Sequence, residues 1–508
     1  AAVSSLVKVF PDTAFPPLPE EGEVARTLSM HLACNEYESA QLVVVPLWAE
    51  LPGLTLRPGT LMHTAGAGVI DASQIALHRV GYVEIGLPEY SFPVERTGCY
   101  PDPLLPPDAF TVPAEQTAQP YYVTVHTLPD SAPGLYEGSI TVEAEGAAAL
   151  QVPLKVWVWD FEIPKENSLT TSFWMNENYI RQFYKYPDRL PEEIRRRYYD
   201  LHLEYRVAPL KALPLGGGDL ADDMDYVLKH GQQQFFVSLP ILNTEESRAD
   251  YQKKIRDTQE LIRQRGWTAD VFFYTHDEVA VVGRHLIPEV VTVNRWAKET
   301  FPEWPRLQTS APEQSLVGSV DIWCPTIDHF NPAFLKRRMA AGERLWLYTV
   351  WERPGIMIEF PNTDYRIMFW QCWKYGAEGF LYWGTTHWEY NVQGEERWPA
   401  VPWITYNSQP GHNGCGYLVY PGTGGTPLPS LRLALVRDGI EDYEYLHLLE
   451  KRFEEKKSSL TAAERDEVHS LLAVTPAVIQ DHQHYTDDPA VLSLEREKLA
   501  RWIERLGR

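Results

Sequence analysis

Hydrophobic and polar residues alternate with a period of two in several short segments before residue 163. This alternation is typical of a β-strand with one face in a core, because successive side chains point to opposite sides. In the clearest example, apolar residues stand at every second position from Leu150 to Val158. Further strands are expected at Gln41 to Leu47, Tyr121 to Thr127 and Ser139 to Glu145. We therefore expect a β-sandwich domain over residues 1–163.

The pattern changes after a proline-containing linker at residues 161–168, where short apolar runs begin to alternate with charged amphipathic segments. Segments such as Pro191 to Tyr205 and Ser247 to Arg265 have the composition of surface helices. Eight strand–helix units over this length predict a (β/α)₈ TIM-like barrel at residues 169–450. The candidate strands are Leu169 to Met175, a segment near Tyr205 to Pro209, Gln234 to Leu239, Asp270 to Thr275, Arg306 to Ser310, Val320 to Cys324, Arg344 to Val350 and Glu378 to Trp383.

Helical signals dominate the end of the chain. A first helix is expected over Leu431 to Leu449, and two more follow it. Residues 451–508 are therefore predicted to be a C-terminal helical extension packed on the barrel. The capping residues of the three helices are Ser430, then Thr461 with Glu464 as a capping box, then Asp488 followed by Pro489.

An acidic stretch lies in the first of these helices, at Asp438, Glu441, Asp442 and Glu444. Runs of charge on a helix are usually a solvated or ion-paired face. We expect this stretch to be structural.

The composition is that of a globular protein, with 508 residues, 44% hydrophobic and 23% charged. We expect roughly two or three domains, and no membrane partner, because no uninterrupted apolar segment is long enough to span a bilayer. The 69 acidic and 46 basic residues give a net charge of −23, which would repel a nucleic-acid backbone. Five scattered cysteines without a CxxC pair, and first residues without a visible secretory signal, favour a cytoplasmic location. Nothing in the pattern indicates an oligomeric state.

The segment Val271 to Glu278 carries the leading candidates for chemistry. It begins as an apolar, aromatic run typical of a buried parallel strand and ends in ionisable side chains. Because the carboxyl end of a barrel strand opens into the active-site face, Asp277 and Glu278 are candidate catalytic residues. No HExxH, P-loop or strand-following GxGxxG motif is present, so neither a metal nor a cofactor is expected.

The chain is rich in aromatic residues, with 17 tryptophans and 27 tyrosines. Their faces can stack on the C–H faces of pyranose rings, and their polar tips can hydrogen-bond to hydroxyl groups. Large cores account for several of them. We expect others to line a carbohydrate site.

Several motifs together resemble glycoside hydrolase family 123, the β-N-acetylgalactosaminidases and their relatives. The motifs are the Asp277-Glu278 pair after an aromatic strand, the segment Trp373 to Trp383, the N-terminal segment Ala33 to Gln41, and the C-terminal segment Leu431 to Leu446. They span nearly the whole chain, and the two terminal motifs are the more specific. Val279 follows the pair where the family often has proline.

The resemblance implies a β-sandwich followed by a (β/α)₈ barrel, and a retaining, substrate-assisted mechanism. In that mechanism the substrate's own 2-acetamido oxygen attacks the anomeric carbon and forms an oxazolinium intermediate. Asp277 would accept the amide N–H, and Glu278 would protonate the leaving oxygen and then deprotonate water. The expected substrate is a glycan with a terminal β-linked N-acetylhexosamine.

Residues at the ends of other barrel strands are candidate substrate contacts. Trp383 would form the stacking floor of the sugar, and Tyr274 or Tyr348 would donate a hydrogen bond to the acetamido oxygen. The remaining candidates are Asn176, Trp323, Trp351 and Trp388.

Two other functions stay open on the sequence. Glu352 follows the seventh strand, so it could be a protein nucleophile with Glu278 as acid/base, as in many retaining barrel glycosidases. The second open function is that of a non-catalytic carbohydrate-binding protein. The sequence does not distinguish N-acetylgalactosamine from N-acetylglucosamine, nor does it indicate linkage or aglycone.

Overall fold

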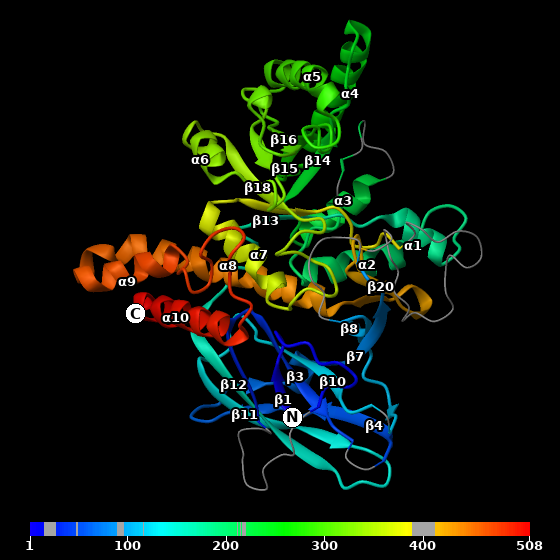
Figure 1. The fold of residues 1–508 in the computed structure, drawn as a ribbon, viewed down its shortest axis with the longest axis vertical. Helices are drawn as coiled ribbons and strands as arrows, with labels where there is room; N and C mark the ends of the chain where they lie inside the picture. The colour runs from blue at the N-terminus through cyan, green and yellow to red at the C-terminus, as the bar shows by residue number, and fades with distance from the viewer. Residues whose placement is uncertain are drawn as a thin grey trace.

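The computed structural model places a region of antiparallel sheet at one end of the molecule and a parallel β/α barrel at the other (Figure 1). It describes residues 1–14, 27–46, 49–88, 96–114, 116–210, 212–213, 215, 220–388 and 412–508.

Two sheets pack face to face in the N-terminal region, which confirms the predicted sandwich. Strands within each sheet are antiparallel, except that β12 and β2 run parallel. The first sheet has the order β1 (Ala2–Ser4), β3 (Tyr37–Val44), β10 (Gln119–His126), β7 (Ile75–Ile85), β8 (Gly98–Leu105). The second has the order β2 (Leu28–Cys34), β12 (Leu150–Glu162), β11 (Gly134–Glu143), β4 (Leu51–Pro58), β9 (Phe110–Val112), with β5 (Leu61–His63) and β6 (Val69–Ile70) attached to it.

Strand β12 has the alternation that the sequence predicted. Its inward side chains pack against the first sheet, whereas Lys155 and Trp157 point outward. Leu150 differs from the prediction, because it lies at the start of the strand and is exposed. The inward residues are Val152, Leu154, Val156 and Val158.

Seven parallel strands form the barrel sheet among the described residues. Each lies within a segment that the sequence predicted to be a strand. In spatial order they are β13 (Thr170–Phe173), β19 (Gly379–Tyr382), β18 (Arg344–Tyr348), β17 (Ile322–Cys324), β16 (Arg306–Thr309), β15 (Asp270–Tyr274) and β14 (Gln234–Ser238).

The predicted strand near Tyr205 to Pro209 is wrong as a regular strand, but the chain still fills its place. Phe173 N–H donates to the carbonyl oxygen of Ala208 at 2.9 Å, and Leu213 N–H donates to that of Phe236 at 2.8 Å. The segment therefore bridges β13 and β14 and closes the barrel. Pro209 has no N–H to donate, which interrupts regular pairing here.

Large aromatic side chains fill the barrel interior. The ring of Trp346 lies directly against Gly379 on the neighbouring strand, where an added Cβ would be 2.2 Å from a ring carbon. Glycine at this position is therefore required by the width of the neighbouring indole ring.

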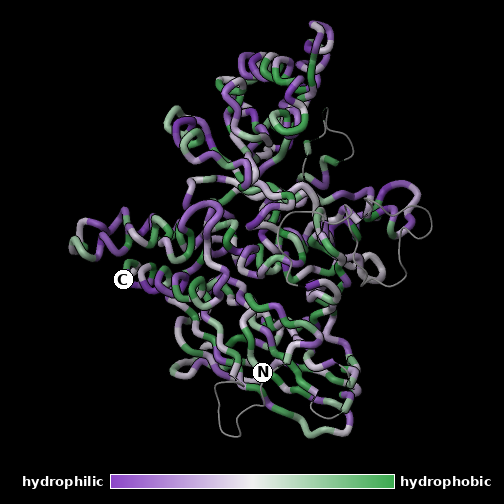
Figure 2. The backbone as a smooth tube through the Cα atoms, viewed as in Figure 1, coloured by the Kyte–Doolittle hydropathy of each residue, from purple (hydrophilic) through white to green (hydrophobic). Residues whose placement is uncertain are grey.

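Helices cover the outside of the barrel (Figure 1). Helix α4 is coloured mostly hydrophilic at the top of Figure 2 and buries only three of its 21 residues. None of the described helices is long and apolar enough to cross a membrane. Their bounds are α1 (Glu177–Phe183), α2 (Glu192–Glu204), α3 (Ala221–Lys229), α4 (Glu245–Arg265), α5 (Ile287–Thr300), α6 (Pro332–Ala340) and α7 (Asp364–Tyr375).

The three C-terminal helices are confirmed, with the predicted caps. They are α8 (Leu431–Lys456), α9 (Ala462–Leu472) and α10 (Pro489–Gly507). Figure 1 shows α8 and α10 crossing between the barrel and the sandwich. Helix α8 runs through the predicted boundary between residues 450 and 451 without a break.

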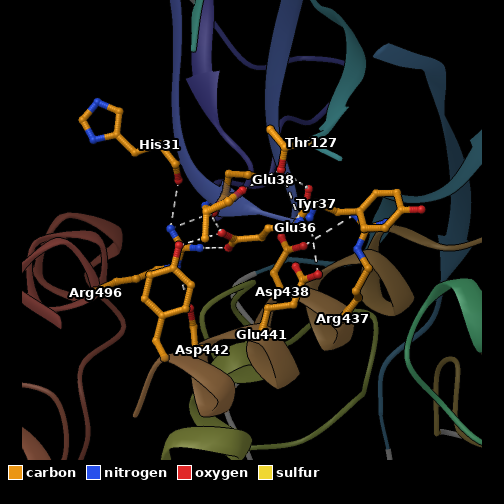
Figure 3. A network of polar contacts seen from close by, with 12 residues as sticks. His31, Glu36, Tyr37, Glu38, Thr127, Arg437, Asp438, Glu441, Asp442 and Arg496 are labelled. Atoms are coloured by element: carbon orange, nitrogen blue, oxygen red, sulfur yellow. Dashed lines mark hydrogen bonds and ion pairs between the residues drawn. The ribbon is translucent and has the colours of Figure 1, made fainter. Parts of the chain in front are cut away.

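The acidic stretch of α8 is expected from the sequence to be either a solvated or an ion-paired helix face. It is buried and ion-paired, so the solvated alternative is wrong. Every residue from Leu431 to Leu446 is buried, because α8 packs against α7, α10 and the sandwich. Figure 3 shows the resulting network of charged side chains at the domain junction. Asp442 accepts hydrogen bonds from Arg366 and Arg496, each at 2.8 Å, and Glu441 accepts one from Arg206 at 3.0 Å.

Asp438 is the least satisfied member of this network. Its closest cation is Arg437 Nη2, at 3.6 Å, and neither of its carboxylate oxygens has a hydrogen-bond partner among the described residues. Burial raises the pKa of Asp438 to about 7, because the charged form has lost its hydration.

Candidate active site

A cavity of about 470 Å³ opens at the carboxyl ends of the barrel strands. Its walls come from the ends of β13, β15, β16, β18 and β19 and from the loops that follow them. The described lining residues are Trp174, Met175, Asn176, Tyr274, Asp277, Glu278, Thr309, Tyr348, Val350, Trp351, Leu381, Trp383 and His387.

The backbone conformation of Glu278 brings both carboxylates into this cavity. Neighbouring side chains on a strand point to opposite sides, so adjacent residues would not normally share a pocket. Glu278 has a φ of 46°, in the left-handed region that non-glycine residues rarely adopt. Its N–H donates to the carbonyl oxygen of Thr309 at 2.8 Å, which holds the chain in this turn after β15.

Asp277 is bound by two hydroxyl groups at one of its oxygens. Oδ1 accepts a hydrogen bond from Tyr274 at 2.7 Å and another from Thr309 at 2.6 Å. The Tyr274 ring is packed between Trp174 and Phe236, at centroid distances of 5.3 and 5.5 Å. Burial and the charge of Asp277 raise the pKa of Tyr274 well above that of free tyrosine, so its hydroxyl remains a donor.

Glu278 has a different environment. Its Oε1 accepts a hydrogen bond from the Tyr348 hydroxyl at 2.5 Å. Burial raises the pKa of Glu278, the Tyr348 hydrogen bond lowers it in part, and the nearby charge of Asp277 raises it again. The net direction is upward, which favours the protonated form and suits a general acid.

Aromatic and amide side chains form the remaining wall. Trp383 lies against His387, with ring centroids 4.9 Å apart, and Asn176 caps the start of α1 beside them. Trp351 is at the mouth, 41% exposed, with its ring 5.0 Å from that of His412. The wall therefore combines apolar faces with polar edges, as sugar-binding surfaces require.

Two predicted contacts, Tyr274 and Tyr348, lie in the cavity with their hydroxyls directed at the carboxylates. The sequence predicts that one of them donates a hydrogen bond to the acetamido oxygen of the substrate. In the structure each is instead the partner of one acid.

Trp323 is a core residue, so its prediction as a substrate contact is wrong. It is fully buried, its Nε1 donates to Glu343 at 2.5 Å, and its ring lies 5.3 Å from Phe334 of α6. Because side chains alternate along β17, Ile322 and Cys324 face the barrel interior and Trp323 faces the helix layer.

Trp388 is also a core residue and lies outside the cavity. It is fully buried, its Nε1 donates to the carbonyl oxygen of Val419 at 2.9 Å, and its ring contacts Phe183 of α1.

Glu352 does not share the cavity of the acidic pair. It lines a separate cavity together with Asp328 and Arg353. Its Oε2 accepts the N–H groups of Val350 at 3.1 Å and Trp351 at 3.0 Å, so it is directed at its own loop. Burial raises the pKa of Glu352 to about 7.

Several lining residues were not anticipated from the sequence. The sequence marks Thr309 only as part of a predicted strand, although it ends β16 at the same face as the acidic pair. Position at a strand's carboxyl end is the signal that would have found it. The others are Trp174, Met175, Val350, Leu381 and His387.

In the part of the chain that the structure describes, no three His, Cys, Asp or Glu side chains come together as a possible metal site.

Comparison with protein families gives one match. Residues 222–449 match the family described as Glycoside hydrolase 123, catalytic domain. The matched range includes the acidic pair and most of the barrel, and begins after β13. No curated protein matches the chain in sequence.

Among solved structures, a family 123 glycoside hydrolase from Clostridium perfringens, studied for glycolipid glycan hydrolysis, is similar over 95% of this chain and 94% of its own. The TM-score is 0.69 and the sequence identity 13%, so this similarity shows the fold. A family 39 glycoside hydrolase from Bacteroides cellulosilyticus WH2 matches with a TM-score of 0.34 and 11% identity, over 81% of each chain. That score is too low to support an argument.

Proposed function

Since residues 222–449 are a glycoside hydrolase family 123 catalytic domain, we propose that this protein is a retaining exo-glycoside hydrolase that releases terminal β-linked N-acetylgalactosamine by substrate-assisted catalysis. The observation that carries the proposal is that adjacent Asp277 and Glu278 line one cavity and have separate partners. We propose glycans, among them those of glycolipids, as the substrates.

The proposed chemistry uses neighbouring atoms of the substrate. The 2-acetamido oxygen attacks the anomeric carbon while the bond to the leaving oxygen breaks and Glu278 gives that oxygen its proton. Asp277 accepts the amide N–H and offsets the positive charge of the oxazolinium intermediate. Glu278 then removes a proton from water. The water oxygen attacks the anomeric carbon and opens the oxazolinium ring, which restores the acetamido group. The sugar leaves with its configuration retained.

Adjacent carboxylates suit this division of work. C1 and C2 are neighbouring atoms of the sugar, so the acid at the C1 oxygen and the base at the C2 nitrogen need to be close together. A retaining enzyme with its own nucleophile instead places its two carboxyls about 5 Å apart across the anomeric carbon. The pKa of Glu278 is raised above that of a free glutamate, which supports its assignment as the acid.

The geometry gives little support to Glu352 as a protein nucleophile. Its carboxylate is directed at main-chain N–H groups and lines another cavity. A nucleophile must reach the anomeric carbon beside Glu278, which would require this loop to rearrange.

The test compares matched aryl glycosides that differ only at C2. We expect turnover of an aryl β-N-acetylgalactosaminide and loss of several decades in kcat/KM for the aryl β-galactoside, which has no acetamido nucleophile. Equal turnover of both would refute substrate assistance. The aryl β-N-acetylglucosaminide, which differs at C4, tests the choice of sugar.

A further inference from the structure

The loop that carries the acidic pair is held by three consecutive residues at the end of β16. Gln308 Nε2 donates to the carbonyl oxygen of His276 at 2.5 Å, and Ser310 Oγ accepts the N–H of Ala280 at 2.9 Å. The Gln308 and Ser310 side chains are both fully buried, so water does not compete for these bonds. The loop is therefore fixed on either side of the acids, and Thr309 lies at the centre of the three.

Thr309 contacts both acids through different groups. Its hydroxyl donates to Asp277 Oδ1 at 2.6 Å, and its carbonyl oxygen accepts the N–H of Glu278 at 2.8 Å. It is itself 2% exposed and lies in the cavity wall. The side chain orients the first acid, and the main chain holds the second in its left-handed conformation.

The hydroxyl donors of Tyr274 and Thr309 are both directed at the same oxygen of Asp277. The hydroxyls of Tyr274 and Thr309 are 3.1 Å apart, and each has one hydrogen to donate. With both hydrogens directed at Oδ1, that oxygen accepts twice and carries no proton. The other oxygen, Oδ2, is then left for a donor that arrives with the substrate.

We propose that Thr309 is a positioning residue for the substrate amide: with Tyr274 it holds one oxygen of Asp277, so that the other meets the acetamido N–H. This role rests on the proposed function. A positioning role differs from a purely structural role in what a substitution of Thr309 should do. It should slow only the attack of the acetamido oxygen, which is the step that Asp277 assists.

The experiment uses the full chain and aryl β-N-acetylgalactosaminides with leaving groups of graded acidity. Thr309→Val removes the hydroxyl but keeps the shape and the carbonyl, whereas Thr309→Ser keeps the hydroxyl. We expect Thr309→Val to lower kcat by about tenfold to a hundredfold, the loss of one hydrogen bond to a charged group, with KM changed much less. Because the acid is untouched, the loss should be the same for good and poor leaving groups. Thr309→Ser should recover most of the activity.

The matched control is Thr363→Val. Thr363 is buried outside the cavity, and its hydroxyl has no partner among the described residues, so the same chemical change there should leave kcat unchanged. If Thr309→Val does not fold, Tyr274→Phe removes the other donor to the same oxygen. It should also give a loss that is independent of the leaving group.

The outcomes separate this inference from the proposed function. A wild-type kcat in Thr309→Val, or a loss that grows for poor leaving groups, would overturn the role of Thr309. The proposed function would still stand if the wild-type enzyme required the acetamido group of the substrate. Equal wild-type turnover of acetamido and hydroxyl substrates would refute the proposed function, and the amide-positioning role with it.

Discussion

Replacing Asp277 with asparagine is the sharpest test of the site, because the structure indicates how the new amide would orient. Two hydroxyl donors, from Tyr274 and Thr309, are directed at Oδ1. The amide oxygen of asparagine would take that position, since it can accept both bonds. The NH₂ group would then occupy the position of Oδ2, where the substrate's own N–H needs an acceptor.

The expected loss follows from this opposition of donors. The variant loses a hydrogen bond to a charged group, which is worth about 1.5–3 kcal/mol. It also leaves the asparagine NH₂ group facing the substrate N–H, two donors without an acceptor, at a cost of about 1–3 kcal/mol. A combined cost of roughly 2.5–6 kcal/mol corresponds to about a 10²- to 10⁴-fold fall in kcat/KM. The loss should be similar for every leaving group, because the acid remains.

Glu278→Gln is the matched variant. Tyr348 can still donate to the amide oxygen of glutamine, so the side chain should keep its place. Only the transferable proton is lost, at a cost of about 10²- to 10⁴-fold for a substrate whose leaving oxygen needs protonation. A nitrophenol, which leaves without a proton, should be affected much less.

The assay is kcat/KM for both variants against aryl glycosides of graded phenol pKa. We expect a steeper dependence on the leaving group for Glu278→Gln than for the wild type, and a parallel dependence for Asp277→Asn. Parallel dependences for the two variants would refute the separate roles. Wild-type rates in either variant would remove that residue from the site.

Three further predictions follow from the packing. Trp383→Ala should lower kcat/KM by about tenfold to a hundredfold through loss of a stacking face, with little change in Tm, and a large fall in Tm without a selective catalytic loss would make Trp383 a core residue. Trp323→Ala should instead lower the free energy of unfolding by about 3–5 kcal/mol, measured by denaturant unfolding, while the folded fraction keeps its kcat/KM, and a selective rise in KM would contradict our correction. Because burial raises the pKa of Asp438 from 3.8 to about 7, this residue contributes stability that is present below pH 4 and is lost as the pH rises through about 7, so Tm should fall between about pH 4 and 7. Asp438→Asn should reduce that fall and raise Tm at pH 8, and an unchanged pH dependence would show that Asp438 is not its source.

Local rules in the sequence were enough to predict most elements of this protein. The period of two in β12, the capping box of α9 and the Asp488-Pro489 start of α10 act over a few residues, and each element formed where expected. The acidic pair could also be located, because parallel strands place their carboxyl ends at one face of a barrel whatever the details of packing. What these rules share is that backbone geometry alone, or neighbours within one turn, determines them.

Tertiary structure decided what each side chain faces. Trp323 lies in a barrel strand as predicted, but as the middle residue of β17 it points toward α6, on the opposite side from Ile322 and Cys324. Which side of the strand faces the barrel interior is decided by packing and not by the strand's own sequence. The acidic stretch of α8 reads as a surface pattern, yet α8 is enclosed by the sandwich and α10, and arginines distant in sequence pair with it.

Thr309 shows the same limit within the site itself. It is an ordinary strand residue in sequence, and its role arises only because β16 lies beside β15 and presents one hydroxyl and one carbonyl to two adjacent acids. The left-handed turn at Glu278, held by that carbonyl, is likewise a contact between strands. Hydrogen bonds between residues more than 30 positions apart have no local pattern, so only the folded chain could reveal them.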